Sequence, residues 1–192
     1  MDEEGKDMVP LFETFLNYIP APEGDPDAGT QVLISTIDYN EYVGRIGIGK
    51  VDNGKVSVNQ DVVIVNHHDK DKMQRVKISK LYEFDGLNKV EVKEAGIGSI
   101  VAISGIADIH IGDTLCSPEN PVAIPFQKIS EPTIAMHFIV NDSPLAGQEG
   151  KVVTSRHLRD RLFSELNHDV SLRVEETENT DSFKVSGRGE LH

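Results

Sequence analysis

Residues 42–58, YVGRIGIGKVDNGKVSV, decide between two very different folds. Their segment Gly44–Lys50 has the spacing of a phosphate-binding loop, in which backbone N–H groups surround the phosphates of a nucleotide. In such a loop the next residue is Ser or Thr, whose hydroxyl binds Mg²⁺, and a helix begins at the lysine. Here Val51 follows, and the Asn-Gly pair at 53–54 predicts a β-hairpin. We therefore interpret the stretch as a glycine-rich strand that holds no phosphate.

The rest of residues 31–125 also has the pattern of short β-strands separated by turns. Apolar and β-branched runs recur about every 8–12 residues, and Gly, Asn and Asp mark the turns between them. The runs are QVLISTI (31–37), KVSVNQDVVIV (55–65), MQRVKISKLYEF (73–84), GSIVAISGI (98–106) and GDTL (112–115). This arrangement predicts a small closed β-barrel or a β-sandwich.

The pattern changes after residue 126, where strand and helix signals alternate. The segments are the strand TIAMHFIV (133–140), the amphipathic helix TSRHLRDRLFSELNHD (154–169), and the strands VSLRVEE (170–176) and SFKVSG (182–187). Thr154 or Ser155 is the predicted N-cap of the helix. The order β-α-β-β is the first part of a ferredoxin-like α+β unit, which continues with a helix and a fourth strand when complete.

Two proline-containing stretches mark the boundaries between these parts. They are PAPEGDPDAG (20–29), which is also acidic, and SPENPVAIP (117–125). We therefore predict a short helical segment over residues 1–20, a β-barrel domain over 21–125 and an incomplete α+β domain over 126–192.

Charge and composition exclude several classes of protein. The formal net charge of -13 argues against a general nucleic-acid coat protein, although it leaves room for a local basic patch. The single cysteine, Cys116, cannot form an internal disulfide, which suits a reducing cytoplasm. The acidic start MDEEGKD does not resemble a secretory signal, and no apolar run is long enough to span a membrane.

Neither catalysis nor metal binding has a convincing set of residues. The turn NHHDKDK (66–72) contains His67, His68, Asp69 and Asp71, but a third group of ligands is missing nearby, so we interpret it as a solvated turn. The serines and the cysteine lack the motifs of nucleophilic catalysis. We expect no catalytic, cofactor-binding or metal-binding residue in this chain.

Basic residues near the predicted helix are the best candidates for contact with a partner. They are Lys151, Arg156, Arg159, Arg161 and Arg188. Two interpretations stay open: a solvated helix face with ion pairs between residues four apart, or a patch that contacts nucleic-acid phosphates. Arg159 has no acidic residue four positions away on either side, so we expect it to be the arginine most available to a partner.

Three long stretches together resemble one protein family. The stretches YIPAPEGDPDAG…STIDYNEYVGRIGIGKV, ISEPTIAM…NDSPLAGQEGKVVTSRHLRDRL and SLRVEETENTDSFKVSGRGELH are similar to the second and third domains of the BipA/TypA translational GTPases. The more general GSIVAISGIADIHIGDTL resembles the barrel domain shared with elongation factors G and Tu. The resemblance implies a translation-factor domain II β-barrel followed by an incomplete ferredoxin-like third domain, with the opening helix as the end of a GTPase domain.

The resemblance also implies a function for the intact parent protein. That function is ribosome binding through rRNA and ribosomal proteins, with roles in ribosome assembly, translation regulation and stress adaptation in the cytoplasm. A phosphate loop, a magnesium-binding aspartate motif and a guanine-reading Asn-Lys-x-Asp do not occur in this sequence. We therefore expect GTP and Mg²⁺ to be held by a GTPase domain of the parent outside this chain, and GTP hydrolysis is not carried over to these residues. The GTPase and C-terminal domains of the parent are expected partners.

Two alternatives belong to other functional classes, and one further contact follows from topology. The alternatives are a stand-alone β-barrel that docks onto proteins and a nucleotide-binding enzyme that uses Gly44–Lys50. Without the fourth strand of a ferredoxin-like unit, the strand at Thr133–Val140 would have one unpaired edge. We expect self-association through that edge.

Overall fold

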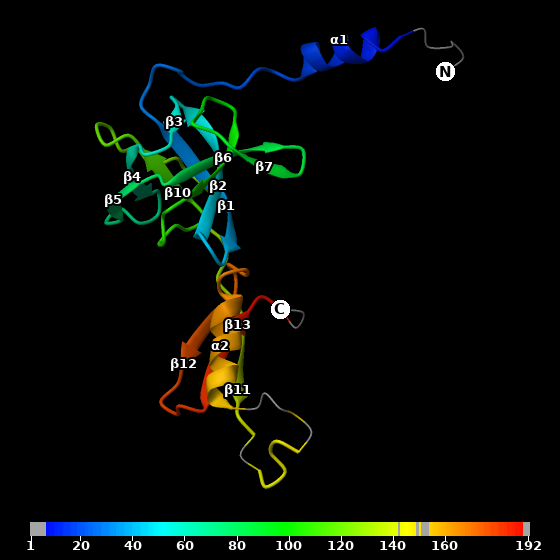
Figure 1. The fold of residues 1–192 in the computed structure, drawn as a ribbon, viewed down its shortest axis with the longest axis vertical. Coiled ribbons are helices and arrows are strands. Elements are labelled where there is room, and N and C mark those ends of the chain that lie inside the picture. Colours follow the sequence, from blue (N-terminus) through cyan, green and yellow to red (C-terminus); the bar gives the residue numbers. More distant parts are fainter. Residues whose placement is uncertain (1–6, 142, 149, 151–153, 190–192) are drawn as a thin grey trace.

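The chain forms three successive parts, which the computed structural model describes for residues 7–141, 143–148, 150 and 154–189. A helix comes first, a β-rich part follows, and a smaller α+β part lies at the other end, joined to it by extended chain (Figure 1). No helix within the described ranges is long and apolar enough to cross a membrane.

Helix α1 (Val9–Tyr18) projects away from the β-rich part (Figure 1). Its first turn contains Pro10, whose missing N–H and restricted φ suit the start of a helix. None of its residues is buried. The helix predicted before Pro20 is therefore present, and its apolar side chains face solvent.

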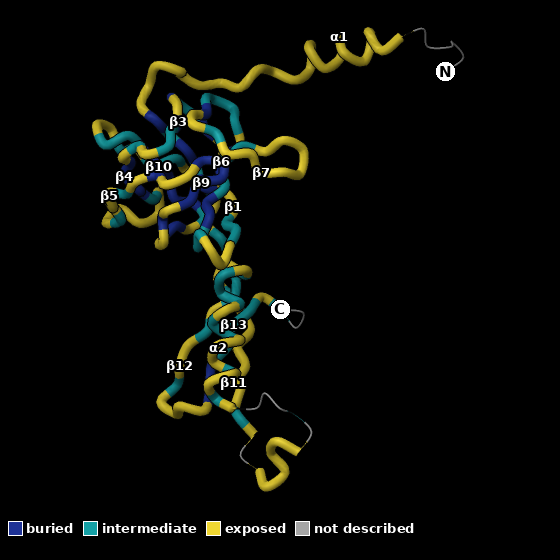
Figure 2. The backbone as a smooth tube through the Cα atoms, in the orientation of Figure 1, coloured by how far each residue is buried: buried dark blue, intermediate teal, exposed yellow. Residues whose placement is uncertain are grey.

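The β-rich part is a rolled antiparallel sheet around a main core, with a smaller separate cluster of buried apolar residues. Its strands are β1 (Gln31–Asn40), β2 (Gly44–Asn53), β3 (Val56–Ser57), β4 (Asp61–Asn66), β5 (Met73–Lys77), β6 (Lys80–Asp85), β7 (Asn88–Glu91), β8 (Glu94–Ala95), β9 (Ile100–Ser104) and β10 (Asp113–Cys116). Eight strands are hydrogen-bonded in the order β5-β4-β10-β1-β2-β9-β6-β7, and β3 pairs with β8. The buried residues gather inside this roll (Figure 2), and they include Ile34, Ile64, Leu81, Ile103 and Leu115. The predicted β-barrel class is confirmed, although the sheet order does not pair β5 with β7.

Strand β2 settles the question raised by the Gly44–Lys50 segment. It pairs with β1 on one side and with β9 on the other, so the whole segment is extended and lies inside the sheet. A Cβ at Gly49 would collide with the carbonyl oxygen of Leu33, so the close approach of β1 requires a glycine there. The segment is a strand, as predicted, and its backbone does not form a phosphate-binding loop.

The α+β part consists of β11 (Ile134–Ile139), α2 (Ser155–Glu165), β12 (Arg173–Glu176) and β13 (Ser182–Gly187). The sheet order is β11-β13-β12, which confirms the predicted β-α-β-β arrangement. Thr154 is the N-cap of α2, and its hydroxyl accepts a hydrogen bond from the His157 N–H. Among the described residues beyond 126, Phe183 is the one apolar side chain that is buried. This part therefore has a much smaller core than the barrel.

Strand β11 is an edge strand with no charged residue. It has β13 as its neighbour on one side and no described strand on the other. All six of its residues are exposed, including Ile134, Met136 and Phe138 on one face. The unpaired edge predicted for this strand is present.

Candidate nucleic-acid interface

Two arginines of α2 form the ion pairs between residues four apart that the sequence predicts. Arg156 Nε lies 4.0 Å from Asp160 Oδ2. Arg161 contacts Glu165, also four residues away. The remaining helix-proximal candidate, Lys151, lies outside the described residues.

The inference that Arg159 lacks an acidic partner is wrong. Its Nε donates to Glu176 Oε1 at 2.7 Å, and its guanidinium carbon lies 4.9 Å from the centre of the Phe163 ring. Glu176 comes from β12, which packs beside the helix, so counting acidic residues four positions along the helix cannot find it. Arg188 donates to the carbonyl oxygen of Ser130 at 3.4 Å, which places it at the connection between the two parts.

The ion pairs of the α2 arginines are exposed to solvent, and their exposure determines how much each pair contributes to stability. More than half of each arginine side chain is in contact with solvent. Exposed ion pairs of this kind contribute about 0.2–1 kcal/mol, because water and salt screen the charges. A phosphate group can therefore replace the carboxylate at small cost, and pairing does not remove these arginines as candidate phosphate contacts.

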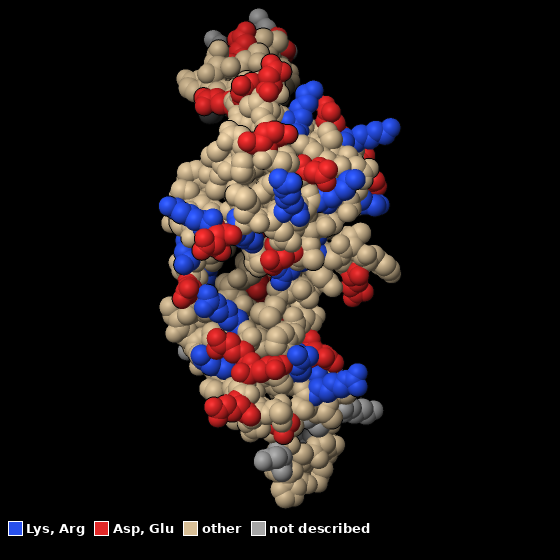
Figure 3. Space-filling model, turned by 90° about the vertical axis from the view of Figure 1, so that its left-hand side faces the viewer, with Lys and Arg blue, Asp and Glu red and all other residues tan. Residues whose placement is uncertain are grey.

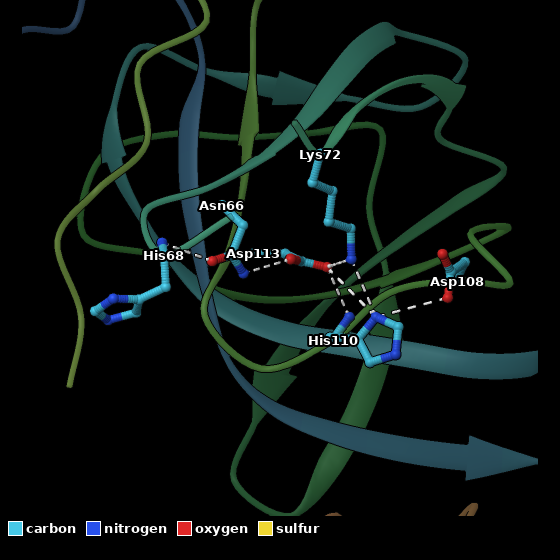
Figure 4. Close-up of polar contacts among 6 residues, drawn as sticks. All are labelled: Asn66, His68, Lys72, Asp108, His110 and Asp113. Carbon is cyan, nitrogen blue, oxygen red and sulfur yellow. Dashed lines mark hydrogen bonds and ion pairs between the residues drawn. The ribbon is translucent and has the colours of Figure 1, made fainter. Parts of the chain in front are cut away.

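A second polar cluster, missed by sequence reasoning, lies between the turn after β4 and the start of β10 (Figure 4). At its centre the fully buried carboxylate of Asp113 accepts three hydrogen bonds: from Asn66 Nδ2 at 2.9 Å, from Lys72 Nζ at 2.9 Å and from the His110 backbone N–H at 2.8 Å. A buried carboxylate with an ammonium partner and two neutral donors is fully satisfied. The cluster ties the turn after β4 to the start of β10.

The turn NHHDKDK anchors the connection between the two parts. His68 Nε2 lies 2.9 Å from the carbonyl oxygen of Phe126, and the two rings meet edge to face with centroids 4.8 Å apart. The Phe126 ring also lies against Gly112, where any Cβ would collide with it. His67 stacks edge-on against His68. These side chains therefore fix the path of the chain as it leaves the barrel.

Sequence reasoning missed this cluster because its members are far apart along the chain. Lys72 and Asn66 precede Asp113 by 41 and 47 residues. The available signal was an aspartate at the start of a predicted buried strand, since a buried carboxylate needs a cation or several donors.

Hydrogen bonds and burial shift the pKa values of two carboxyl groups and of the cysteine thiol. A hydrogen bond from Lys89 is the main reason why the pKa of Asp38 lies below its usual range. A hydrogen bond from Lys184 likewise lowers the pKa of Glu175. Burial raises the pKa of the Cys116 thiol, which disfavours the reactive thiolate.

Comparison with known proteins gives the family and the fold. Residues 44–116 match the profile of elongation factor Tu domain 2. The chain is 50% identical over all of its 192 residues to the large ribosomal subunit assembly factor BipA of Synechocystis sp., of which it covers 32%. It is 47% identical over 191 residues to BipA of Salmonella typhimurium, covering 100% of this chain and 31% of that protein. The predicted resemblance to the BipA/TypA family is confirmed, and the chain spans about a third of the length of these relatives.

A solved structure supports the same fold. A crystal structure of a protein from Thermus thermophilus superimposes with a TM-score of 0.65 over 95% of this chain and 26% of that chain. The sequences are 21% identical, so the likeness concerns the fold.

Proposed function

We propose that this chain, a segment of a BipA-family translational GTPase, is a ribosome-binding part of that protein and acts in assembly of the large ribosomal subunit. The observation that carries the proposal is 47–50% identity along the whole chain to proteins named as large ribosomal subunit assembly factors. In this proposal the intact parent works in the cytoplasm and also contributes to translation regulation and stress adaptation. Its GTP and Mg²⁺ are held by a domain outside this sequence.

The proposed contacts are the arginines of α2 together with Lys151 and Arg188, which would meet rRNA phosphates. The support is geometric: Arg156, Arg159 and Arg161 are exposed on one helix, and the ion pairs that they form with carboxylates are weak surface pairs. An rRNA phosphate would take the place of the carboxylate at each arginine and release counterions from the RNA.

Co-sedimentation with large ribosomal subunits over a salt series tests this proposal. We expect binding that weakens linearly in a plot of log affinity against log salt, because phosphate contacts release counterions. Binding to ribosomal proteins alone, with little salt dependence, would instead favour the alternative of a protein-docking barrel.

We also propose that the chain itself neither binds nor hydrolyses GTP. The support is that Gly44–Lys50 is a paired strand, whose backbone N–H groups serve the ladders with β1 and β9. The alternative hypothesis, a nucleotide-binding enzyme, requires those N–H groups to surround a phosphate. Self-association through β11 is a further proposal, supported by its uncharged and unpaired edge.

A further inference from the structure

A cavity of about 510 Å³ lies between the barrel and the α+β part. Figure 3 shows the surface hollowed at this level, with positive and negative side chains around it. The turn after β4, the connection before β10, the chain after Phe126 and the start of β12 all contribute to its wall. Its volume falls in the range of about 300–1,000 Å³ that is typical of small-molecule sites, which often occur between domains.

The wall contains hydrogen-bond donors that are held in place before any ligand arrives. Lys72 Nζ donates to Asp113 Oδ2 at 2.9 Å and lies 3.1 Å from His110 Nδ1. An ammonium has only donors, so the contact with His110 Nδ1 is a hydrogen bond when the imidazole is neutral and carries its proton on Nε2. The third N–H of Lys72 and the Nε2–H of His110 remain for a ligand. Because Asp113 is fully buried, this pair of donors is fixed by the barrel itself.

The same wall carries one unpaired cation and two carboxylates. Lys128 forms no ion pair within the described part of the chain, and it lines the cavity. Glu131 Oε1 accepts from Arg173 Nη2 at 3.3 Å, and Asp69 Oδ1 accepts from a backbone N–H of its own turn. The wall therefore offers both donors and acceptors, which suits a ligand that has an anionic group and neutral polar edges.

Apolar and aromatic side chains complete the wall. Ile111, Ile129 and Pro132 line it, and the Phe126 ring is held by Gly112 and His68. A ring fixed in this way loses no freedom when a flat group packs against it, and stacking on aromatic rings is a common way to bind unpaired bases.

We propose that this cavity binds a single nucleotide unit, with its phosphate at Lys128 and Lys72 and its base against Phe126 and Ile111. The nucleotide unit can belong to an unpaired stretch of RNA or be a free nucleoside monophosphate. The inference rests on the proposed function in the first case, where the RNA is ribosomal. A bare phosphate would use the cationic side of the wall and leave the apolar side empty.

Titration of the chain with uridine monophosphate, followed in proton–nitrogen NMR spectra, tests the inference. We expect saturable shifts at the amides of His110, Ile111 and Ile129. The variant Lys128→Glu should bind about tenfold more weakly, because it replaces an ionic contact by a repulsive one. The matched control is Lys93→Glu, which changes another exposed lysine that forms no described ion pair and lies outside the cavity wall.

Two further experiments identify the source of the nucleotide and the role of the Phe126 ring. A short single-stranded RNA that binds more tightly than the monophosphate assigns the site to RNA, and equal affinities assign it to free nucleotides. Phe126→Leu should lower the affinity for uridine monophosphate and leave the affinity for inorganic phosphate unchanged. Thermal unfolding of the variant checks that it is folded.

Equal shifts with inorganic phosphate and uridine monophosphate would overturn the assignment to nucleotides, as would equal weakening in Lys128→Glu and Lys93→Glu. If the chain still co-sediments with ribosomal subunits in that case, the cavity inference fails while the proposed function stands.

Discussion

Replacing Lys72 by methionine should destabilise the barrel far more than the same change at any exposed lysine. Methionine keeps the unbranched apolar stem but removes the ammonium that faces Asp113, whose side chain is 0% exposed. Breaking a buried ion pair in this way costs about 3–5 kcal/mol, because the remaining charge is left buried without a partner. Two neutral donors, from Asn66 and from the His110 backbone, stay in place, so we expect the lower half of that range.

Lys80→Met is the matched control for this prediction. Lys80 Nζ lies 3.4 Å from Glu91 Oε2, and about half of each side chain is exposed. An exposed pair of this kind contributes about 0.2–1 kcal/mol. The two variants thus remove the same chemical group from a buried and from an exposed pair.

Urea unfolding followed by far-ultraviolet circular dichroism measures both variants, since the chain has no tryptophan. A double-mutant cycle with Asp113→Asn completes the test, because a neutral amide no longer needs the ammonium. In that background the cost of Lys72→Met should fall below about 2 kcal/mol. The reasoning fails if Lys72→Met costs no more than Lys80→Met, or if its cost is the same with Asp113→Asn.

The remaining predictions concern RNA contacts, nucleotide binding, association and the cysteine. Arg159→Ala should lower the slope of log affinity against log salt for ribosomal subunits by about one unit, measured by co-sedimentation; an unchanged slope assigns Arg159 to a purely structural role. Calorimetry with GTP and GDP should show no saturable heat, and binding that Lys50→Ala abolishes would contradict this. Light scattering over a concentration series should show association through β11 that Met136→Lys abolishes, and a strictly monomeric chain would exclude it. Burial raises the pKa of Cys116, so the contribution of its neutral thiol to stability is present at neutral pH and is lost as pH rises through the folded-state pKa. Alkylation by iodoacetamide should therefore require unfolding. Rapid modification of the native chain at pH 8 would contradict this.

Local signals were sufficient for helix α2 and for most of the strands, although β7 and β8 were not predicted. Val51 and the Asn-Gly turn identified β2 as a strand, because a phosphate loop requires a metal-binding hydroxyl and a helix at that point. The period of the apolar residues gave the order β11-α2-β12-β13, and the start of α2 was predicted at Thr154 or Ser155, of which Thr154 is the N-cap. All of these features depend on residues within a few positions of one another.

The order of residues was thus enough to predict the class of each part, the resemblance to the family, and which basic residues are candidates for contact with a partner. Which of those residues are paired depends on the packed molecule: Arg159 meets Glu176 from another element, and Lys72 meets Asp113 across 41 positions. The same packing brings Phe126, His110 and Lys128 to the border of one cavity. The difference arises because periodicity and turn chemistry act over one or two turns of chain, whereas an ion pair forms between any two elements that the packing of the core brings within about 4 Å.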